Sequence, residues 1–244
     1  MNKLIVANFK MNATEKELKN LINLYKNNVK TNLALCLPYP YLSLFNQINK
    51  NNLISLGAQN VSQFEKGSYT GEVSALMLSD FNVKYCLVGH AERRKFNAEN
   101  TLQCHEKIKQ LLKNNIVPIL CIGENLNQYN QNLTLKIIRK QINGALKKLN
   151  KEDIKKVIIA YEPIWCIENA TELSPEQAND IASEIIKAVQ KLTQSNHHVC
   201  VLYGGNVLKD NANLFLQEQN IGGILVGKES LNAENFVLLL NNLK

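Results

Sequence analysis

The stretch Val157-Ile158-Ile159-Ala160-Tyr161-Glu162-Pro163-Ile164-Trp165 shows how this chain is organised. It opens with a continuous apolar run rich in β-branched residues, which is typical of a strand buried on both faces of a parallel sheet. Glu162 follows directly, where a carboxylate adds little to packing and is well placed for chemistry. Pro163 and Trp165 then predict a stiff base for a mobile loop. The stretch therefore predicts a buried strand whose carboxyl end carries a functional group.

Seven other short apolar runs are similar to this strand and divide the chain at regular intervals. The eight predicted strands are residues 4–9, 33–37, 53–58, 85–89, 117–122, 157–161, 199–203 and 223–226. Helical patterns lie between them, without a linker or a change of composition. Such alternation predicts parallel strands joined by helices, and eight repeats favour a closed (β/α)8 barrel over an open sheet. We therefore predict a single α/β domain spanning residues 1–244.

The helical patterns are specific enough to predict which faces are buried. Two apolar faces at helical spacing are Leu18, Leu21, Ile22, Tyr25 and Val29, and Leu102, Ile108, Leu111 and Leu112. A further helix is predicted to start at Ser174. Its hydroxyl can cap the helix, Pro175 suits the first helical position, and Gln177 can close a capping box.

Composition argues against several classes of protein and site. Of the 244 residues, 45% are hydrophobic and 20% are charged, as in an ordinary globular protein. No apolar run approaches the roughly 18 residues that span a bilayer, and the N-terminus lacks a signal-peptide pattern. We therefore expect a cytoplasmic location and no membrane partner. Six scattered cysteines without a C-x-x-C pair argue against a disulfide framework and a zinc site.

The net charge of +7 has two interpretations. It can steer an anionic ligand into a cleft, or it can reflect Lys-rich helix surfaces, and we favour the second. No basic stripe with interleaved aromatic residues occurs, so we expect no nucleic-acid partner. Gly222 and Gly227-Lys228 nearly match a phosphate-binding P-loop, but Glu229 stands where Ser or Thr is required. No metal-ligand spacing or dinucleotide fingerprint occurs, so we expect neither a metal nor a cofactor.

Polar motifs stand at the carboxyl ends of other predicted strands. They are Asn8-Phe9-Lys10, Gly89-His90-Ala91-Glu92-Arg93-Arg94 and Tyr203-Gly204-Gly205-Asn206. Further motifs are Gln59-Asn60-Val61, Tyr69-Thr70-Gly71-Glu72, Cys121-Ile122-Gly123-Glu124 and Leu225-Val226-Gly227. With these motifs, the chain resembles the triosephosphate isomerase family over nearly its whole length. The resemblance implies a TIM barrel enzyme of glycolysis and gluconeogenesis that interconverts dihydroxyacetone phosphate and D-glyceraldehyde 3-phosphate through an enediolate, without a cofactor.

The resemblance also implies a role for each polar side chain at the strand ends. Glu162 is expected to be the base that removes a proton from the carbon next to the substrate carbonyl and returns it to the neighbouring carbon. His90 is expected to polarise the substrate oxygens as a neutral imidazole. Lys10 is expected to stabilise the anionic substrate and transition state, with Asn8 as its partner on the same strand face. Glu92 is expected to support His90 through ion pairs.

The resemblance further implies that backbone N–H groups bind the substrate phosphate. The residues expected there are Gly204, Gly205, Asn206, Gly227 and Lys228, together with Glu168. Glycine lets the main chain approach an anion closely, and the loops after the seventh and eighth strands are the usual phosphate site of this barrel. Residues 166–171, here called the lid, are expected to close over the substrate and exclude water.

Some residues depart from the family pattern. Ala91 replaces a Ser whose hydroxyl commonly holds the catalytic glutamate, which leaves the resting position of Glu162 open. Glu168 and Ala170 replace the usual glycines of the lid, and Glu168 adds negative charge near the expected phosphate. Lys228 replaces a second Gly and is a candidate to offset that charge.

The resemblance implies a homodimer that takes a triose phosphate as its small-molecule partner. Residues 60–75 of one subunit, with Thr70 near the tip, would reach the other subunit's site close to Asn8 and Lys10. Two alternatives stay open. Another sugar-phosphate barrel isomerase would share the phosphate loops without the catalytic set. A barrel of the same family with reduced activity would serve as a binding or adhesion protein; the intact catalytic set argues against it, while the altered lid keeps it open.

Overall fold

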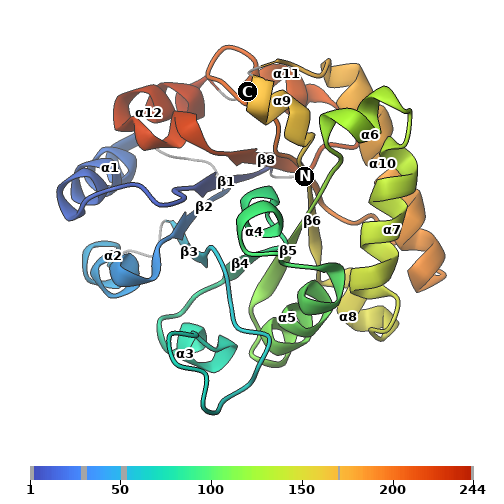
Figure 1. The fold of residues 1–244 in the computed structure, drawn as a ribbon. Helices are drawn as coiled ribbons and strands as arrows, with labels where there is room; N and C mark the ends of the chain where they lie inside the picture. The colour runs from blue at the N-terminus through green and yellow to red at the C-terminus, as the bar shows by residue number, and fades with distance from the viewer. Residues whose placement is uncertain (1–2, 29–31, 51–53, 170, 243–244) are drawn as a thin grey trace.

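A computed structural model of the chain describes residues 3–28, 32–50, 54–169 and 171–242. Within these residues, parallel strands pair in sequence order and close into a barrel, because the last strand pairs with the first (Figure 1). The strands are β1 (Leu4–Asn8), β2 (Asn32–Leu37), β3 (Ser55–Ala58), β4 (Tyr85–Val88), β5 (Val117–Ile122), β6 (Ile158–Tyr161), β7 (Val201–Tyr203) and β8 (Gly223–Val226). The predicted barrel is confirmed, and strand ends shift by two residues at most. Leu53, predicted to open the third strand, lies outside the described residues.

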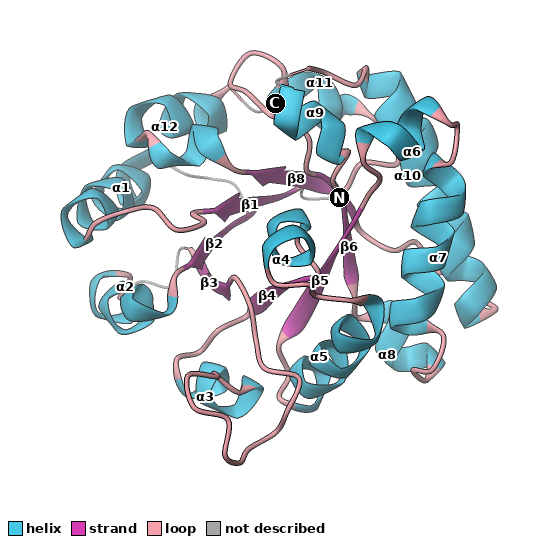
Figure 2. Cartoon of the chain, viewed as in Figure 1, coloured by secondary structure: helices cyan, strands magenta, loops and turns pink. Residues whose placement is uncertain are grey.

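Helices surround the strands (Figure 2). They are α1 (Glu15–Asn28), α2 (Leu42–Ile48), α3 (Ala75–Asp80), α4 (Ala91–Phe96), α5 (Thr101–Lys113), α6 (Leu126–Asn130), α7 (Thr134–Leu146), α8 (Lys151–Lys155), α9 (Ile164–Asn169), α10 (Pro175–Thr193), α11 (Ala212–Gln217) and α12 (Ala233–Asn241), with 3-10 turns η1 (Tyr39–Tyr41) and η2 (Lys228–Leu231). In the part of the chain that the structure describes, none of these helices is both long and apolar enough to cross a membrane.

Every strand except β3 contributes side chains alternately to two apolar layers. Leu4 and Val6 of β1 belong to a cluster inside the barrel, whereas Ile5 and Ala7 pack in a second cluster with the helices. The inner cluster comprises Leu4, Val6, Ala34, Cys36, Tyr85, Leu87, Ile119, Cys121, Ala160, Leu202 and Leu225. Burial on both faces explains why the strands are nearly continuous apolar runs.

The cysteines are part of this packing. All six are free thiols, five of them buried and Cys200 partly buried. Cys36 lies in the inner cluster, where burial raises the pKa of its thiol to about 12. A thiol that stays protonated behaves as a small apolar side chain, so this cysteine packs as part of the core.

The predicted helix faces are confirmed except at one residue. The α1 residues Leu18, Leu21, Ile22 and Tyr25 are buried, and Val29 lies outside the described residues. At the start of α10, the Ser174 hydroxyl accepts a hydrogen bond from the Gln177 N–H at 3.2 Å and completes the capping box. The prediction for Leu102 is wrong, because its side chain is 61% exposed. Cys104 lies on the buried face of α5. Leu102 stands two residues before it, which is more than half a turn of helix, so Leu102 faces the opposite side.

The turn between α4 and α5 contains a strained residue that yields a stability prediction. Ala98 is exposed and has a φ of 52°, a left-handed conformation that costs a residue with a Cβ about 1–2 kcal/mol. We expect Ala98→Gly to raise the free energy of unfolding by about 0.5–1 kcal/mol, since glycine's greater entropy loss offsets part of the relief. Urea denaturation measures the change. The matched control Ala188→Gly, inside α10, should destabilise by about 1 kcal/mol, and a loss of stability in both variants would contradict the argument.

Candidate active site

The carboxylate of Glu162 lies at the carboxyl end of β6, and its residue is only 2% exposed. Its backbone N–H donates to the carbonyl of Ile122 on β5 at 2.8 Å, which fixes where the side chain starts. Oε2 accepts a hydrogen bond from the backbone N–H of Ala91 at 3.2 Å, and Oε1 lies 3.2 Å from Nε2 of His90. The resting position that the sequence left open is therefore set by a backbone amide and an imidazole.

Gly123 makes this position of Glu162 possible. A Cβ on Gly123 would lie 1.8 Å from the carbonyl oxygen of Glu162, a contact that no side chain can make. The main chain after β5 can approach the main chain after β6 only because residue 123 has no side chain. The glycine of the Cys121-Ile122-Gly123-Glu124 motif thus has a packing reason next to the candidate base.

His90 follows β4 and caps the first turn of α4. Its Nδ1 accepts a hydrogen bond from the backbone N–H of Glu92 at 3.3 Å. A neutral imidazole that accepts at Nδ1 carries its proton on Nε2, which is the nitrogen that faces Glu162. The geometry therefore presents an Nε2–H donor beside a carboxylate acceptor, in a nearly buried position.

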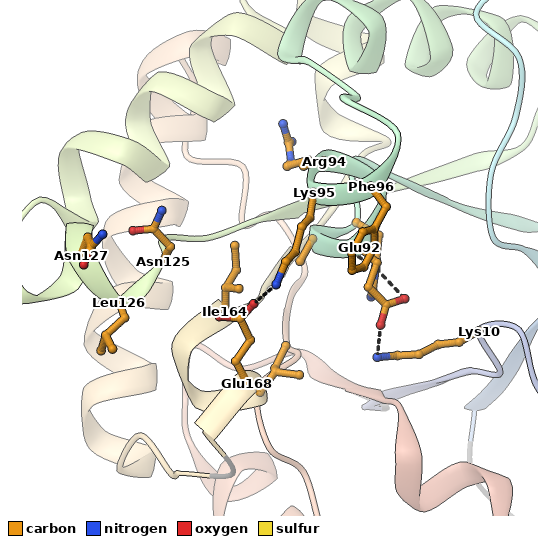
Figure 3. Close-up of a pocket in the computed structure, with 13 residues that line it drawn as sticks. Lys10, Glu92, Arg94, Lys95, Phe96, Asn125, Leu126, Asn127, Ile164 and Glu168 are labelled. Atoms are coloured by element: carbon orange, nitrogen blue, oxygen red, sulfur yellow. Dashed lines mark hydrogen bonds and ion pairs between the residues drawn. The ribbon is translucent and has the colours of Figure 1, made fainter.

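Lys10 connects the end of β1 with two other parts of the site. Its φ of 53° is left-handed, and its backbone N–H donates to Oδ1 of Asn8 at 3.0 Å. Its Nζ lies 2.6 Å from Oε1 of Glu92, as Figure 3 shows. A Cβ on Gly227 would lie 3.5 Å from Cε of Lys10, so the lysine stem passes over the loop that follows β8.

One cavity of about 580 Å³ brings most of the predicted site residues together. Its lining includes the four predicted catalytic residues and the five predicted residues of the β7 and β8 loops: Asn8, Lys10, His90, Glu162, Gly204, Gly205, Asn206, Gly227 and Lys228. The other three predicted site residues, Glu92, Glu168 and Thr70, do not line it. In the described residues, no group of three or more His, Cys, Asp or Glu side chains is placed to hold a metal ion.

The lid begins as a helix rather than as an irregular loop. Ile164–Asn169 forms α9, and Ala170 lies outside the described residues. The buried carboxylate of Glu124, whose pKa is raised by burial, accepts hydrogen bonds from Tyr161 at 3.1 Å and from Nε1 of Trp165 at 2.9 Å. The Trp165 ring also stacks on Tyr129, with centroids 4.1 Å apart. These contacts give the lid the stiff base that the sequence predicted.

Glu168 does not use Lys228 as a partner. Its Oε1 lies 2.7 Å from Nζ of Lys95 on α4, so Lys95 is the cation that pairs with Glu168, and the charge role of Lys228 stays a prediction. The sequence did not predict a role for Lys95. It also did not predict Ile167, which lies on α9 and lines the cavity of about 580 Å³. A Lys that follows two arginines in the α4 motif has no spacing relation to residue 168, so only the fold reveals the pair.

Comparison with known proteins agrees with this geometry. The family model described as triosephosphate isomerase matches residues 3–243. The chain is 38% identical over 244 residues to the triosephosphate isomerase of Mesomycoplasma hyorhinis, with 97% of each chain covered. It is 37% identical over 243 residues to that of Alkaliphilus oremlandii and 38% identical over 248 residues to that of Mycoplasma mobile, with 98% of each chain covered in both. The barrel, the arrangement of the site and these similarities lead to one conclusion: the chain belongs to the triosephosphate isomerase family.

Proposed function

We propose that this protein is a triose-phosphate isomerase that interconverts dihydroxyacetone phosphate and D-glyceraldehyde 3-phosphate in glycolysis and gluconeogenesis, with residues 1–244 as one catalytic domain. One observation carries the proposal. The carboxylate of Glu162 and Nε2 of His90 lie 3.2 Å apart in the cavity that also holds Lys10 and the glycine loops. Proton transfer next to a carbonyl requires a base, a hydrogen-bond donor and a cation around one anion site.

In the proposed mechanism, Glu162 takes a proton from the carbon next to the substrate carbonyl. The electron pair of that C–H bond forms the C=C bond of the enediolate, and the carbonyl π electrons move to oxygen. Nε2–H of His90 and the ammonium of Lys10 stabilise the oxygen as charge develops on it. The hydroxyl proton on the first carbon moves to this oxygen, with Nε2 of His90 placed to pass it. As the first carbon forms the new carbonyl, the C=C electron pair takes the proton back from Glu162 at the neighbouring carbon, so the base is regenerated and no oxidant or cofactor takes part.

The loops that follow β7 and β8 are the proposed phosphate site. Glycines at positions 204, 205 and 227 leave room for backbone N–H groups to contact phosphate oxygens. The cavity lining supports this assignment, because it joins both loops to Glu162 and His90. Asn206 and Lys228 would contribute backbone N–H groups, and the lid near Glu168 would complete the enclosure on closure.

The proposed charge role of Lys10 gives a binding prediction. Lys10→Ala removes the cation and leaves the carboxylate of Glu92 without its partner at 2.6 Å, so the site becomes more negative. A charged hydrogen bond is worth about 1.5–3 kcal/mol, and we expect the Kd for inorganic phosphate to rise by about 10- to 100-fold. Isothermal titration calorimetry measures it. Lys19→Ala, at an exposed lysine of α1, is the control, and equal affinity in both variants would remove Lys10 from this role.

We also propose a cytoplasmic homodimer. The connection between β3 and α3 is a long loop that projects from the barrel edge (Figure 2), and Phe64 and Tyr69 stack on it with centroids 3.9 Å apart. Met11 is 96% exposed and Phe96 is 72% exposed beside the cavity that contains Lys10. Exposed apolar side chains of this kind mark protein interfaces, and Thr70 on the loop would approach the partner's Lys10. A fully active monomer in sedimentation experiments would contradict the dimer.

The activity itself is tested by kcat/KM for D-glyceraldehyde 3-phosphate in a coupled assay. We expect a value that approaches the diffusional ceiling, about 10⁸ M⁻¹s⁻¹ or above. Undetectable turnover by the folded protein would overturn the proposal and favour a binding protein built on the same barrel. Turnover of a different sugar phosphate alone would favour another isomerase with the same phosphate loops.

A further inference from the structure

Helix α9 borders two cavities that meet at Lys10 and His90. Ile167 and the glycine loops line the first, which is the candidate active site. The second, of about 670 Å³, lies on the α4 and α6 side of α9. Ile167 lines both cavities, whereas Glu168 lines only the second. The carboxylate of Glu168 is therefore turned away from the expected phosphate position.

An ion pair joins α9 to α4. Nζ of Lys95 lies 2.7 Å from Oε1 of Glu168, and the two side chains point toward each other from their separate helices (Figure 3). Lys95 also lies over the ring of Phe96, 5.6 Å from its centroid. Among the ion pairs of the described residues, this pair is the one that reaches α9. It therefore holds α9 on the side of the second cavity.

We propose that the Lys95–Glu168 ion pair is a latch that opposes closure of the lid over the substrate phosphate. For backbone N–H groups of α9 to reach a phosphate on the glycine loops, α9 has to move away from Lys95, and the pair has to break. A glycine at position 168 would have no side chain with which to form this pair. The latch rests on the proposed function, since it presumes a phosphate on those loops.

The expected size of the effect follows from the exposure of the pair. The side chains of Lys95 and Glu168 are 59% and 44% exposed. Solvent-exposed pairs are weak, and their loss shifts an equilibrium by about 1.5- to 5-fold. Lys95 is thus a positioning residue that tunes affinity without touching the substrate.

The direction of the change in Lys95→Gln separates a latch from simple charge attraction. If Lys95 only attracts anions, its loss weakens phosphate binding. If the pair is a latch, its loss frees the lid and strengthens binding. At about 0.15 M salt, screening over roughly 8 Å weakens the attraction between Lys95 and the anion. Release of the lid therefore decides whether the Kd falls or rises.

The test is a binding titration of the whole protein with 2-phosphoglycolate, whose phosphate and planar carboxylate mimic the enediolate. We expect Lys95→Gln to lower the Kd by about 1.5- to 5-fold and to lower KM in parallel without raising kcat. Fluorescence of Trp165, the single tryptophan of the chain, reports the environment of α9 without turnover. In Lys95→Gln, the change in Trp165 fluorescence on ligand binding should saturate at a correspondingly lower ligand concentration than in the wild type.

Two further variants complete the design. Lys95→Arg keeps a cation opposite Glu168 and should leave the Kd at the wild-type value. Arg139→Gln removes a pair with Glu184, also at 2.7 Å, that joins α7 to α10 away from both cavities, and it should leave the Kd unchanged. An unchanged or higher Kd in Lys95→Gln would overturn the latch. A wild-type protein without isomerase activity would overturn the proposed function instead, while its Trp165 titration would still report on the latch.

Discussion

Glu162→Asp is expected to lower kcat by about 10²-fold or more. The substitution keeps the charge and retracts the carboxylate by one methylene group. In the native site, the carboxylate oxygens are held at 3.2 Å from the Ala91 N–H and at 3.2 Å from Nε2 of His90. A base that starts too far from the substrate carbon has to distort this arrangement in every proton transfer, so the chemical step slows.

Substrate binding should change much less than turnover, because the proposed phosphate contacts lie on the loops that follow β7 and β8. Steady-state kinetics that resolve kcat and KM make the distinction. Glu15→Asp, at an exposed position of α1, makes the same chemical change far from the site and serves as the control. Turnover at the wild-type rate in Glu162→Asp would show that another group is the base.

The barrel was predictable from the sequence because its strands are buried on two sides. Residues such as Leu4 and Ile5 face different apolar layers, so both are apolar and the strand is a continuous run. The candidate catalytic residues were predictable for a related reason. A carboxylate at position 162 or an imidazole at position 90 has no packing purpose at the end of such a strand.

Features that depend on contacts between distant segments were not predictable. The partnership of Lys95 with Glu168 joins residues on α4 and α9 that no sequence pattern relates. The exposure of Leu102 depends on which face of α5 meets the barrel. The resting position of Glu162 depends on the backbone N–H of Ala91, and a backbone amide is present whatever the side chain.

Glu99→Gln is expected to cost about 3–5 kcal/mol of folding free energy at pH 7. Glu99 is 4% exposed and accepts four hydrogen bonds, from Lys107 Nζ at 2.5 Å, from Arg93 Nε at 2.7 Å, from the Gly89 N–H at 2.8 Å and from Cys104 Sγ at 3.7 Å. The amide oxygen of the variant can still accept from Lys107 but carries no charge, so the buried ammonium keeps only neutral partners such as Oδ1 of Asn60 at 2.7 Å. An uncompensated buried charge is the costly outcome.

The loss of folding free energy in Glu99→Gln should depend on pH. The groups around Glu99 determine the direction of that dependence. Burial alone raises the pKa of Glu99, but Lys107, Arg93 and the Gly89 amide together outweigh burial and hold the pKa below its ordinary value. A carboxyl group whose pKa is lowered on folding stabilises the protein above its unfolded pKa, about 4.3. That stabilisation is lost as the pH falls through the lower, folded pKa.

Urea unfolding of the wild type and of Glu99→Gln at a series of pH values tests both expectations. The stability gap should be wide and constant near neutral pH and should shrink below about pH 4, where the wild type also loses its carboxylate. Glu106→Gln, at a partly exposed residue of α5, should change stability by no more than about 0.5 kcal/mol. A gap as large at pH 3.5 as at pH 7 would show that the Glu99 charge is not what stabilises this region. Because Gly89 directly precedes His90, loss of the network should also loosen the turn that carries the imidazole, which ties the stability of this cluster to the geometry of catalysis.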